Sequence, residues 1–268
     1  MAVKKNKPDY KNWMPKHYLV VLAVFTALFL GLTILFGPLC FFLKRWLRVF
    51  LSILFFLIFL LFLVFLIIGC IWYKTFSYDG KRQFAKEIID RLSQYCDLPD
   101  GGNALDVGCG SGALTIATAK RNPKAMVTGI DFWGIEYIDI TKQLCEDNAR
   151  AEGVDNTEFI RGSIKKIKYP DEYFDHVTSN YCYSNMIDFD KQSLLLESLR
   201  VLKKGGTFAI HDVMNWVNFG DMNKFVDKLK EMGFEDVKLI DTSKGLFMSE
   251  QEAWFLSLKG SMLLYGKK

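Results

Sequence analysis

Two long apolar runs stand out near the start of the chain. Residues 18–43 and 49–73 contain no Asp, Glu, Lys or Arg. Because a helix rises about 1.5 Å per residue, each run is long enough to cross a hydrocarbon core of about 30 Å. We therefore expect a transmembrane helical hairpin over residues 18–73, with the short turn KRWLR at 44–48. A helical pair buried in a large core is the alternative.

The charges that flank the two runs predict their orientation, because the cytoplasmic ends of membrane helices carry an excess of Lys and Arg. The basic residues before and after the hairpin are Lys4, Lys5, Lys7, Lys11 and Lys16, then Lys74, Lys81, Arg82, Lys86 and Arg91. The turn holds only Lys44, Arg45 and Arg48. We therefore expect a two-span protein of the cell membrane with both termini cytoplasmic. Residues 1–17 are then a basic N-terminal segment and 74–80 a linker.

From residue 81 onward, short apolar strands alternate with amphipathic helices, after a first helix over 81–95. The expected strands are 103–107, 125–130, 157–160, 174–179, 206–212, 235–241 and 261–266, and the expected helices between them are 112–121, 135–152, 190–202 and 221–232. This alternation predicts one α/β domain, residues 81–268, with a doubly wound, mostly parallel sheet. Its expected location is the cytoplasmic face of the membrane.

Composition argues against several classes of function. The six cysteines show no CxxC spacing, and two of them, Cys40 and Cys70, fall within the apolar runs. This pattern suits neither a zinc site nor a disulfide framework, and we expect no metal. The formal net charge of +4 is too small to indicate a nucleic-acid partner. The lipid bilayer and a small molecule are the partners that the sequence favours.

The stretch ALDVGCGSGALT, residues 104–115, joins the first strand of the domain to a helix. Glycines at 108, 110 and 112 allow a tight turn and let a ligand approach the amides at the start of the helix. Asp106 precedes the turn, and Asp131 ends the next strand, where a carboxylate can accept hydrogen bonds from ribose hydroxyls. The arrangement predicts a nucleoside-binding site. The same glycines fit the dinucleotide fingerprint, so a nicotinamide cofactor is an alternative.

Five segments together resemble the class I S-adenosylmethionine-dependent methyltransferases, which have a Rossmann-like fold. They are LDVGCGSG, VTGIDF, FIRGSI, FDHVTSN and RVLKKGGTFAIHD, and the resemblance covers about residues 78–268. It implies a seven-stranded sheet of order 3-2-1-4-5-7-6 whose last strand is antiparallel. It also implies the cofactor S-adenosyl-L-methionine, with S-adenosyl-L-homocysteine as product.

The resemblance implies a role for each matching residue. Asp106, Gly108, Gly110 and Gly112 are expected at the methionine part, Asp131 at the ribose, Phe132 at the adenine, and Asn180 at the methyl-donor pocket. Many relatives place an acid near position 163, whereas this chain has Ser163 followed by Ile164, so the contact to the adenine amine is less well defined. Tyr78 is expected at the methionine carboxylate, or else as an aromatic residue at the membrane interface.

Three residues at strand ends are candidates for catalysis. The donor is a sulfonium, so the protein mainly has to align the acceptor, and a base is needed only if the acceptor must lose a proton. His211 is the candidate base, and a hydrogen-bonded histidine packed beneath the pocket is the alternative. Tyr181 and Tyr183 are expected to orient an acceptor or contact the sulfonium, with structural packing as the alternative.

The segment SKGLFMSEQEAWFLSLKG, residues 243–260, carries many apolar residues for a loop. We expect a wall of the acceptor site, an interfacial segment on the bilayer, or ordinary packing. The leading interpretation is a membrane-anchored methyltransferase acting on a hydrophobic or lipid acceptor at the cytoplasmic face. The alternatives are an enzyme acting on a soluble metabolite, for which the hairpin is only an anchor, and a non-catalytic adenosylmethionine-binding sensor or scaffold.

Overall fold

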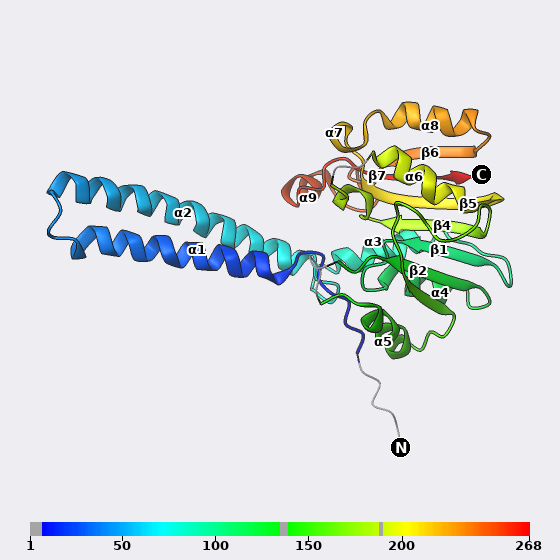
Figure 1. The fold of residues 1–268 in the computed structure, drawn as a ribbon, viewed down its shortest axis with the longest axis horizontal. Coiled ribbons are helices and arrows are strands. Elements are labelled where there is room, and N and C mark those ends of the chain that lie inside the picture. Colours follow the sequence, from blue (N-terminus) through cyan, green and yellow to red (C-terminus); the bar gives the residue numbers. More distant parts are fainter. Residues whose placement is uncertain (1–6, 135–138, 188–189) are drawn as a thin grey trace, which may run out of the picture. The chain divides into compact units, whose positions relative to one another are not determined.

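The computed structural model describes residues 7–134, 139–187 and 190–268 (Figure 1). These residues form two compact units. One unit contains residues 12–85, and the other contains residues 7–11 together with 86–268. The chain therefore passes between the units twice.

The first unit is a helical hairpin. Helix α1 (Lys16–Ile34) continues as a π-helical turn, η1 (Leu35–Leu39), and α2 (Arg45–Thr75) returns. By length and composition, the stretches Lys16–Leu39 and Arg45–Thr75 could each cross a membrane, with mean hydropathies of 2.8 and 3.4. Pro38 lies inside η1, where the helix widens and then ends. The turn consequently lies at residues 40–44, earlier than the predicted 44–48.

Aromatic and small residues pack the two helices of the hairpin together. The ring of Phe62 stacks on Phe25 and Phe29, with centroids 5.2 and 5.4 Å away. At Gly69 the helices approach closely, since a Cβ there would lie 2.9 Å from Leu19 Cδ2. Such close contacts allow two apolar helices to pack side by side.

The second unit contains a seven-stranded sheet. Its elements are α3 (Phe84–Ser93), which crosses the boundary in sequence, β1 (Asn103–Val107), α4 (Ala113–Arg121), β2 (Met126–Asp131), α5 (Lys142–Glu152), β3 (Thr157–Arg161), β4 (Phe174–Asn180), η3 (Tyr183–Asn185), α6 (Lys191–Arg200), β5 (Leu202–Val213), α7 (Trp216–Phe219), α8 (Met222–Glu231), β6 (Glu235–Asp241), α9 (Glu250–Phe255) and β7 (Ser261–Lys267). The strand order is β3-β2-β1-β4-β5-β7-β6, and β7 pairs antiparallel with both neighbours. The expected sheet is confirmed.

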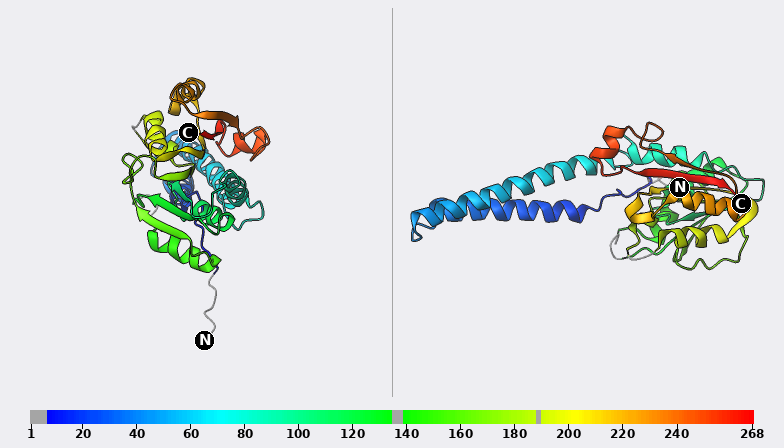
Figure 2. Two further views of the ribbon diagram at one scale, coloured as in Figure 1. Left: turned by 90° about the vertical axis from the view of Figure 1, so that its right-hand side faces the viewer. Right: turned by 90° about the horizontal axis from the view of Figure 1, so that it is seen from above.

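Helices cover both faces of this sheet (Figure 2). Side chains alternate between the faces along a strand, so Leu105 packs with α6 and α8, whereas Ala104 packs with α4. Because β1, β4, β5 and β6 run in the same direction, their carboxyl ends meet at one edge of the sheet. This edge carries the polar residues discussed below.

Two features of the domain differ from the sequence-based expectation. Helix α5 begins at Lys142 rather than residue 135, because the side chain of Thr141 accepts a hydrogen bond from the amide of Leu144 and so caps it. Residues 135–138 lie outside the described part of the chain. The short helices α7 and α9 were not expected, since each is too brief to show helical periodicity.

Candidate functional site

The glycine turn between β1 and α4 is held by the neighbouring strand β2. The amides of Gly108 and Cys109 both donate to the carbonyl oxygen of Ile130, at 2.8 and 3.1 Å. Gly108 has φ +73°, and a Cβ there would lie 2.2 Å from Cys182 Sγ. Only glycine fits this position, because both the backbone conformation and the packing exclude a side chain.

Gly110 differs from Gly108 in having open space beside it. Its φ is +54°, and a Cβ there would meet nothing within 4 Å. Its amide donates to Asp131 Oδ2 at 2.9 Å. The turn is thus tied to the end of β2 while a face of its backbone stays open to a ligand.

Asp131 accepts a second hydrogen bond through its other oxygen. The amide of Trp133 donates to Oδ1 at 2.7 Å, and the indole Nε1 of Trp133 donates to the carbonyl oxygen of Gly110 at 3.0 Å. Each carboxylate oxygen has two lone pairs, so Asp131 retains capacity for two more donors. Two ribose hydroxyls fit that capacity.

Asp106 is a buried acid beneath the turn. Its Oδ2 accepts a 2.6 Å hydrogen bond from Thr115 Oγ1, which can reach it because Gly129 has no side chain in the way. Burial raises the pKa of Asp106 to about 7, and the Thr115 bond opposes that rise. A cationic ligand group nearby would stabilise the carboxylate. The site therefore suits an ammonium group.

The residues predicted at the adenine lie at the ends of β2 and β3. Phe132 is 62% exposed, and the Arg161 guanidinium lies 5.2 Å from its ring centroid. The amide of Gly162 donates to the carbonyl oxygen of Asp131 at 2.9 Å, which places Ser163 beside this edge. Ile164 is buried in the main core. Tyr78 lies in a turn of the helical unit, and its role stays a prediction.

His211 is fully buried in a row of polar side chains. Its Nδ1 lies 2.8 Å from Asn180 Oδ1 and its Nε2 lies 2.9 Å from Thr242 Oγ1, which in turn donates to the carbonyl oxygen of Ser261. Burial lowers the pKa of His211 to about 3, so the imidazole is neutral. The ring is satisfied as a neutral imidazole if Nδ1–H donates to Asn180 Oδ1 and the Thr242 hydroxyl shares its proton between Nε2 and the Ser261 carbonyl oxygen. This is the geometry of a packed, orienting histidine.

The two candidate tyrosines also have partners inside the domain. Tyr181 adopts φ +49°, and its hydroxyl lies 2.9 Å from Ser261 Oγ. The Tyr183 hydroxyl donates to Ser198 Oγ at 2.8 Å within the core. The amide of Tyr183 donates to buried Asp212, whose pKa is raised by burial. Catalytic roles for His211, Tyr181 and Tyr183 stay predictions.

Sequence reasoning missed two residues that shape the turn. Trp133 contacts the glycine turn from the β2 side through its indole N–H. Its position directly after Asp131 and Phe132 could have indicated this role. Asn148 of α5 is 1% exposed and donates to the carbonyl oxygens of Ser111 and Asp9, at 3.0 and 3.1 Å. It also accepts from the amide of Asp9 at 2.7 Å. No local pattern links residue 9 to residue 148.

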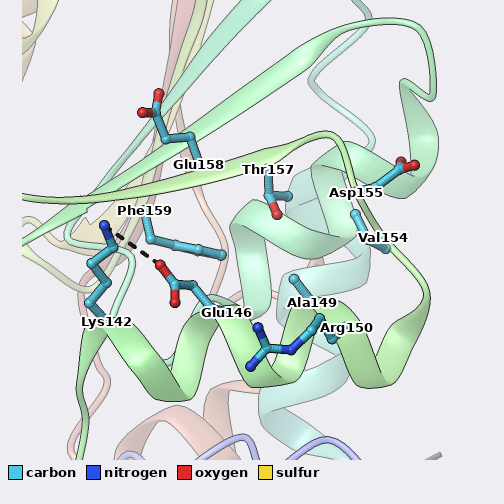
Figure 3. A pocket seen from close by; sticks show the side chains of 9 residues that line it. All are labelled: Lys142, Glu146, Ala149, Arg150, Val154, Asp155, Thr157, Glu158 and Phe159. Atoms are coloured by element: carbon cyan, nitrogen blue, oxygen red, sulfur yellow. Dashed lines mark ion pairs between the residues drawn. The ribbon is translucent and has the colours of Figure 1, made fainter. Parts of the chain in front are cut away.

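Two cavities lie elsewhere in the domain. One, of about 250 Å³, lies between α5 and β3 and is lined by charged residues such as Lys142 and Glu146, which form a 3.6 Å ion pair (Figure 3). The other, of about 600 Å³, lies where β5 and β6 end. No group of three His, Cys, Asp or Glu residues in the described ranges could hold a metal ion.

Comparison with known proteins agrees with this geometry. A family profile described as "Methyltransferase domain" matches residues 98–254. The chain is 33% identical over 122 residues to the demethylmenaquinone methyltransferase of Bacillus licheniformis, covering 45% of this chain and 49% of that protein. It is 31% identical over 133 residues to the enzyme of that name from Geobacillus stearothermophilus, covering 49% of this chain and 52% of that protein.

The chain thus spans about half the length of the curated relatives it matches. The solved structure of the 4+2 cyclase SpnF shares the fold, with a TM-score of 0.54 and 20% identity over 72% of this chain and 85% of that one. The family match, the strand order and the glycine turn agree. The chain belongs to the methyltransferase-domain family.

Proposed function

We propose that this protein is an S-adenosylmethionine-dependent methyltransferase anchored to the cell membrane by its two apolar helices. The observation that carries the proposal is the hydrogen bond from the Gly110 amide to Asp131. It ties the glycine turn to the end of β2, leaves the backbone beside Gly110 open, and points to a site for an adenosyl group.

We assign a different part of the cofactor to each of several residues. We assign Asp131 to the ribose, Phe132 to the adenine, and Asp106 to the ammonium group, directly or through water. Asn180 ends β4 beside this site and is half-buried. We assign His211 to the orientation of Asn180, because the two side chains are in hydrogen-bond contact.

The chemistry supplied by the bound cofactor is a methyl group on a sulfonium, which is already activated for transfer. The domain then has to align the acceptor with that methyl group and exclude water. The side chains that could serve as a base have partners within the domain and, for His211, a pKa far below neutrality. We therefore favour an acceptor whose proton is lost to water or was lost before binding.

A hydrophobic acceptor suits both the apolar helices and the relatives. The matched proteins from Bacillus and Geobacillus are named for demethylmenaquinone, and we propose a hydrophobic quinone or similar membrane-dissolved molecule for this chain. Residues 76–83, between α2 and α3, reach at most about 30 Å when fully extended. If α2 spans a bilayer, the domain stays within that distance of its surface, which we place on the cytoplasmic side.

The proposal is tested with full-length protein in lipid nanodiscs and methyl-labelled adenosylmethionine. Host lipid extract is supplied in one reaction and the soluble metabolite fraction in another, with Asp131→Ala as the control. We expect label to enter the organic phase with the natural chain and to be lost in the variant. Label in the aqueous phase alone would indicate a soluble acceptor, and the hairpin would then serve only as an anchor.

The internal partners of all three candidate catalytic side chains favour one alternative, a sensor that binds adenosylmethionine without transferring it. Tight cofactor binding that depends on Asp131, with no transfer to either fraction or to synthetic quinones, would support the sensor and contradict the enzyme.

A further inference from the structure

We infer that the end of the domain formed by α7 and α9 is a second membrane contact, which docks on the surface of the bilayer. We call this the docking face and define it by Trp216, Val217, Lys244, Trp254 and Lys259. The inference rests on the proposed membrane anchoring and adds to it a surface of the folded domain.

The apolar side chains of the docking face are among the most exposed of the chain. Trp216 is 70% exposed, Val217 is 91% exposed, and Trp254 is 75% exposed. The neighbours of these residues along the chain are buried, since Phe219, Ala253 and Leu256 each expose less than 4%. The two short helices are therefore fixed to the core by one side while they present large apolar groups to the surroundings. Exposed apolar groups that gather in one patch are typical of a contact with a partner or a membrane.

Contacts within the domain bring α7 and α9 to one place. Asn215, which caps α7, and Trp254 of α9 line the same cavity of about 600 Å³. The amide of Met214 donates to the carbonyl oxygen of Gly260 at 2.9 Å, so the segment before α7 is tied to the segment after α9. The starts of α7 and of the segment after α9 are therefore neighbours, and we infer that the exposed apolar residues of the two helices belong to one face.

The charges of the docking face fit phospholipid headgroups. Lys244 and Lys259 line the cavity and are exposed, and acidic Asp241 and Glu250 line it as well. A zwitterionic headgroup carries a phosphate and an ammonium group, so it can satisfy both signs. Tryptophan is enriched where an apolar phase meets such headgroups, because its ring is apolar and its N–H is polar.

The position of the docking face on the sheet also favours a bilayer. The cavity lies at the carboxyl ends of β5 and β6, on the same edge of the sheet as the glycine turn that follows β1. A domain docked through this face would turn its cofactor edge toward the lipid, where a hydrophobic acceptor dissolves. The connector at residues 76–83 allows this contact, since it holds the domain within about 30 Å of the membrane surface.

The test uses full-length protein reconstituted in vesicles of phosphatidylcholine and phosphatidylethanolamine that contain a phospholipid with a photoactivatable headgroup. Peptides that carry cross-linked lipid are then mapped by mass spectrometry. We expect cross-links at the ends of α1 and α2, where the anchor meets the headgroups, and also in residues 214–220 and 250–260. Trp216→Ser combined with Trp254→Ser should lower the yield in these two segments at least about fivefold.

Met232→Ser is the matched control, because Met232 is an exposed apolar residue (55%) just beyond α8 and outside the docking face. It should leave all cross-links unchanged, and thermal unfolding should show that each variant is folded. Cross-links in α1 and α2 without any in the docking face would overturn the inference and leave the anchored enzyme intact. Absence of cross-links in α1 and α2 would instead overturn the anchor and the inference together.

Discussion

The amide of Gly110 and the carboxylate of Asp131 are joined by a 2.9 Å hydrogen bond that links the turn after β1 to the end of β2. The same carboxylate accepts a hydrogen bond from the amide of Trp133, and the indole N–H of Trp133 donates to the Gly110 carbonyl oxygen. One side chain thus fixes the backbone on which a cofactor would lie. The predictions below follow from this and related contacts.

Asp131→Ala removes the acceptor for two backbone amides and for the ribose. We expect adenosylmethionine to bind at least about tenfold more weakly, since an unsatisfied polar group costs about 1–3 kcal/mol. Isothermal titration calorimetry of the full chain measures the dissociation constant. An unchanged constant would show that the ligand lies elsewhere.

Gly108→Ala and Gly110→Ala should separate stability from binding. A Cβ at Gly108 collides with Cys182 and is strained by a positive φ, so we expect a loss of about 2 kcal/mol or more in the free energy of unfolding. A Cβ at Gly110 meets open space, so the loss there should be about 1 kcal/mol, from φ alone.

The same Cβ at Gly110 would occupy the space assigned to the ligand, and adenosylmethionine affinity should fall in that variant. Denaturant unfolding and calorimetry on both proteins provide the two readouts. Equal losses of unfolding free energy in Gly108→Ala and Gly110→Ala would contradict the prediction that only Gly108 is closely packed.

Asp106 should make cofactor binding depend on pH. Its pKa is raised by burial to about 7 without ligand, and a bound ammonium group should lower it. Affinity should therefore rise as pH increases from 6 to 8, and Asp106→Asn should flatten that dependence. Calorimetry across this range, at constant ionic strength, measures it.

The stability of the ligand-free protein should change with pH in the opposite direction to the affinity for the cofactor. Because the folded pKa lies above the usual value of 3.8, the native state binds more protons than the unfolded state between pH 4 and 7. Asp106 thus contributes stability that declines as pH rises through that window. The measurement is the free energy of unfolding of the natural chain and of Asp106→Asn between pH 4 and 7. The same pH dependence in both proteins would contradict the prediction.

His211→Asn should slow methyl transfer without changing its pH profile. The imidazole is neutral throughout the physiological range, and we assign it to the orientation of Asn180 rather than to proton transfer. The rate of transfer between pH 6 and 9 is the measurement. A fall in rate toward low pH that is present in the natural chain and disappears in the variant would establish His211 as a base.

Asn148→Ala should release residues 7–11 from the domain. Asn148 makes three hydrogen bonds, two of them to the backbone of Asp9, so we expect a loss of about 1–3 kcal/mol in unfolding free energy. Limited trypsin digestion should then cut faster after Lys11. Gln143→Ala, at an exposed position on the same helix, is the control and should leave the cleavage rate unchanged.

The elements with strong local signals were predictable from the sequence. The bounds of β1 and β6 agree with expectation, because each is a short strand that follows turn residues. The strand order came from the resemblance and was confirmed. The start of α5 was misplaced, since the cap at Thr141 was not considered. The turn of the hairpin was placed too late, because its basic residues belong to the first turn of α2.

The internal partners of the site could not be predicted, since they join residues distant in the chain. His211 of β5 contacts Thr242, which directly follows β6, because β5 and β6 both pair with β7 and their ends are therefore close. Asp9 and Asn148 lie 139 positions apart. The segment 243–260 shows the same limit: Phe247 and Met248 are buried whereas Trp254 is exposed, although all are equally apolar in sequence.

The double passage of the chain between its two units makes the helical hairpin an insertion within the domain rather than an appendage at one end. A domain on a single tether can swivel about it, whereas a domain with two covalent links has far less rotational freedom. If the hairpin is fixed in a bilayer, the second link adds a restraint on the domain before any ligand binds. Part of the entropy of ordering the domain is then lost during folding and insertion rather than at each encounter with an acceptor.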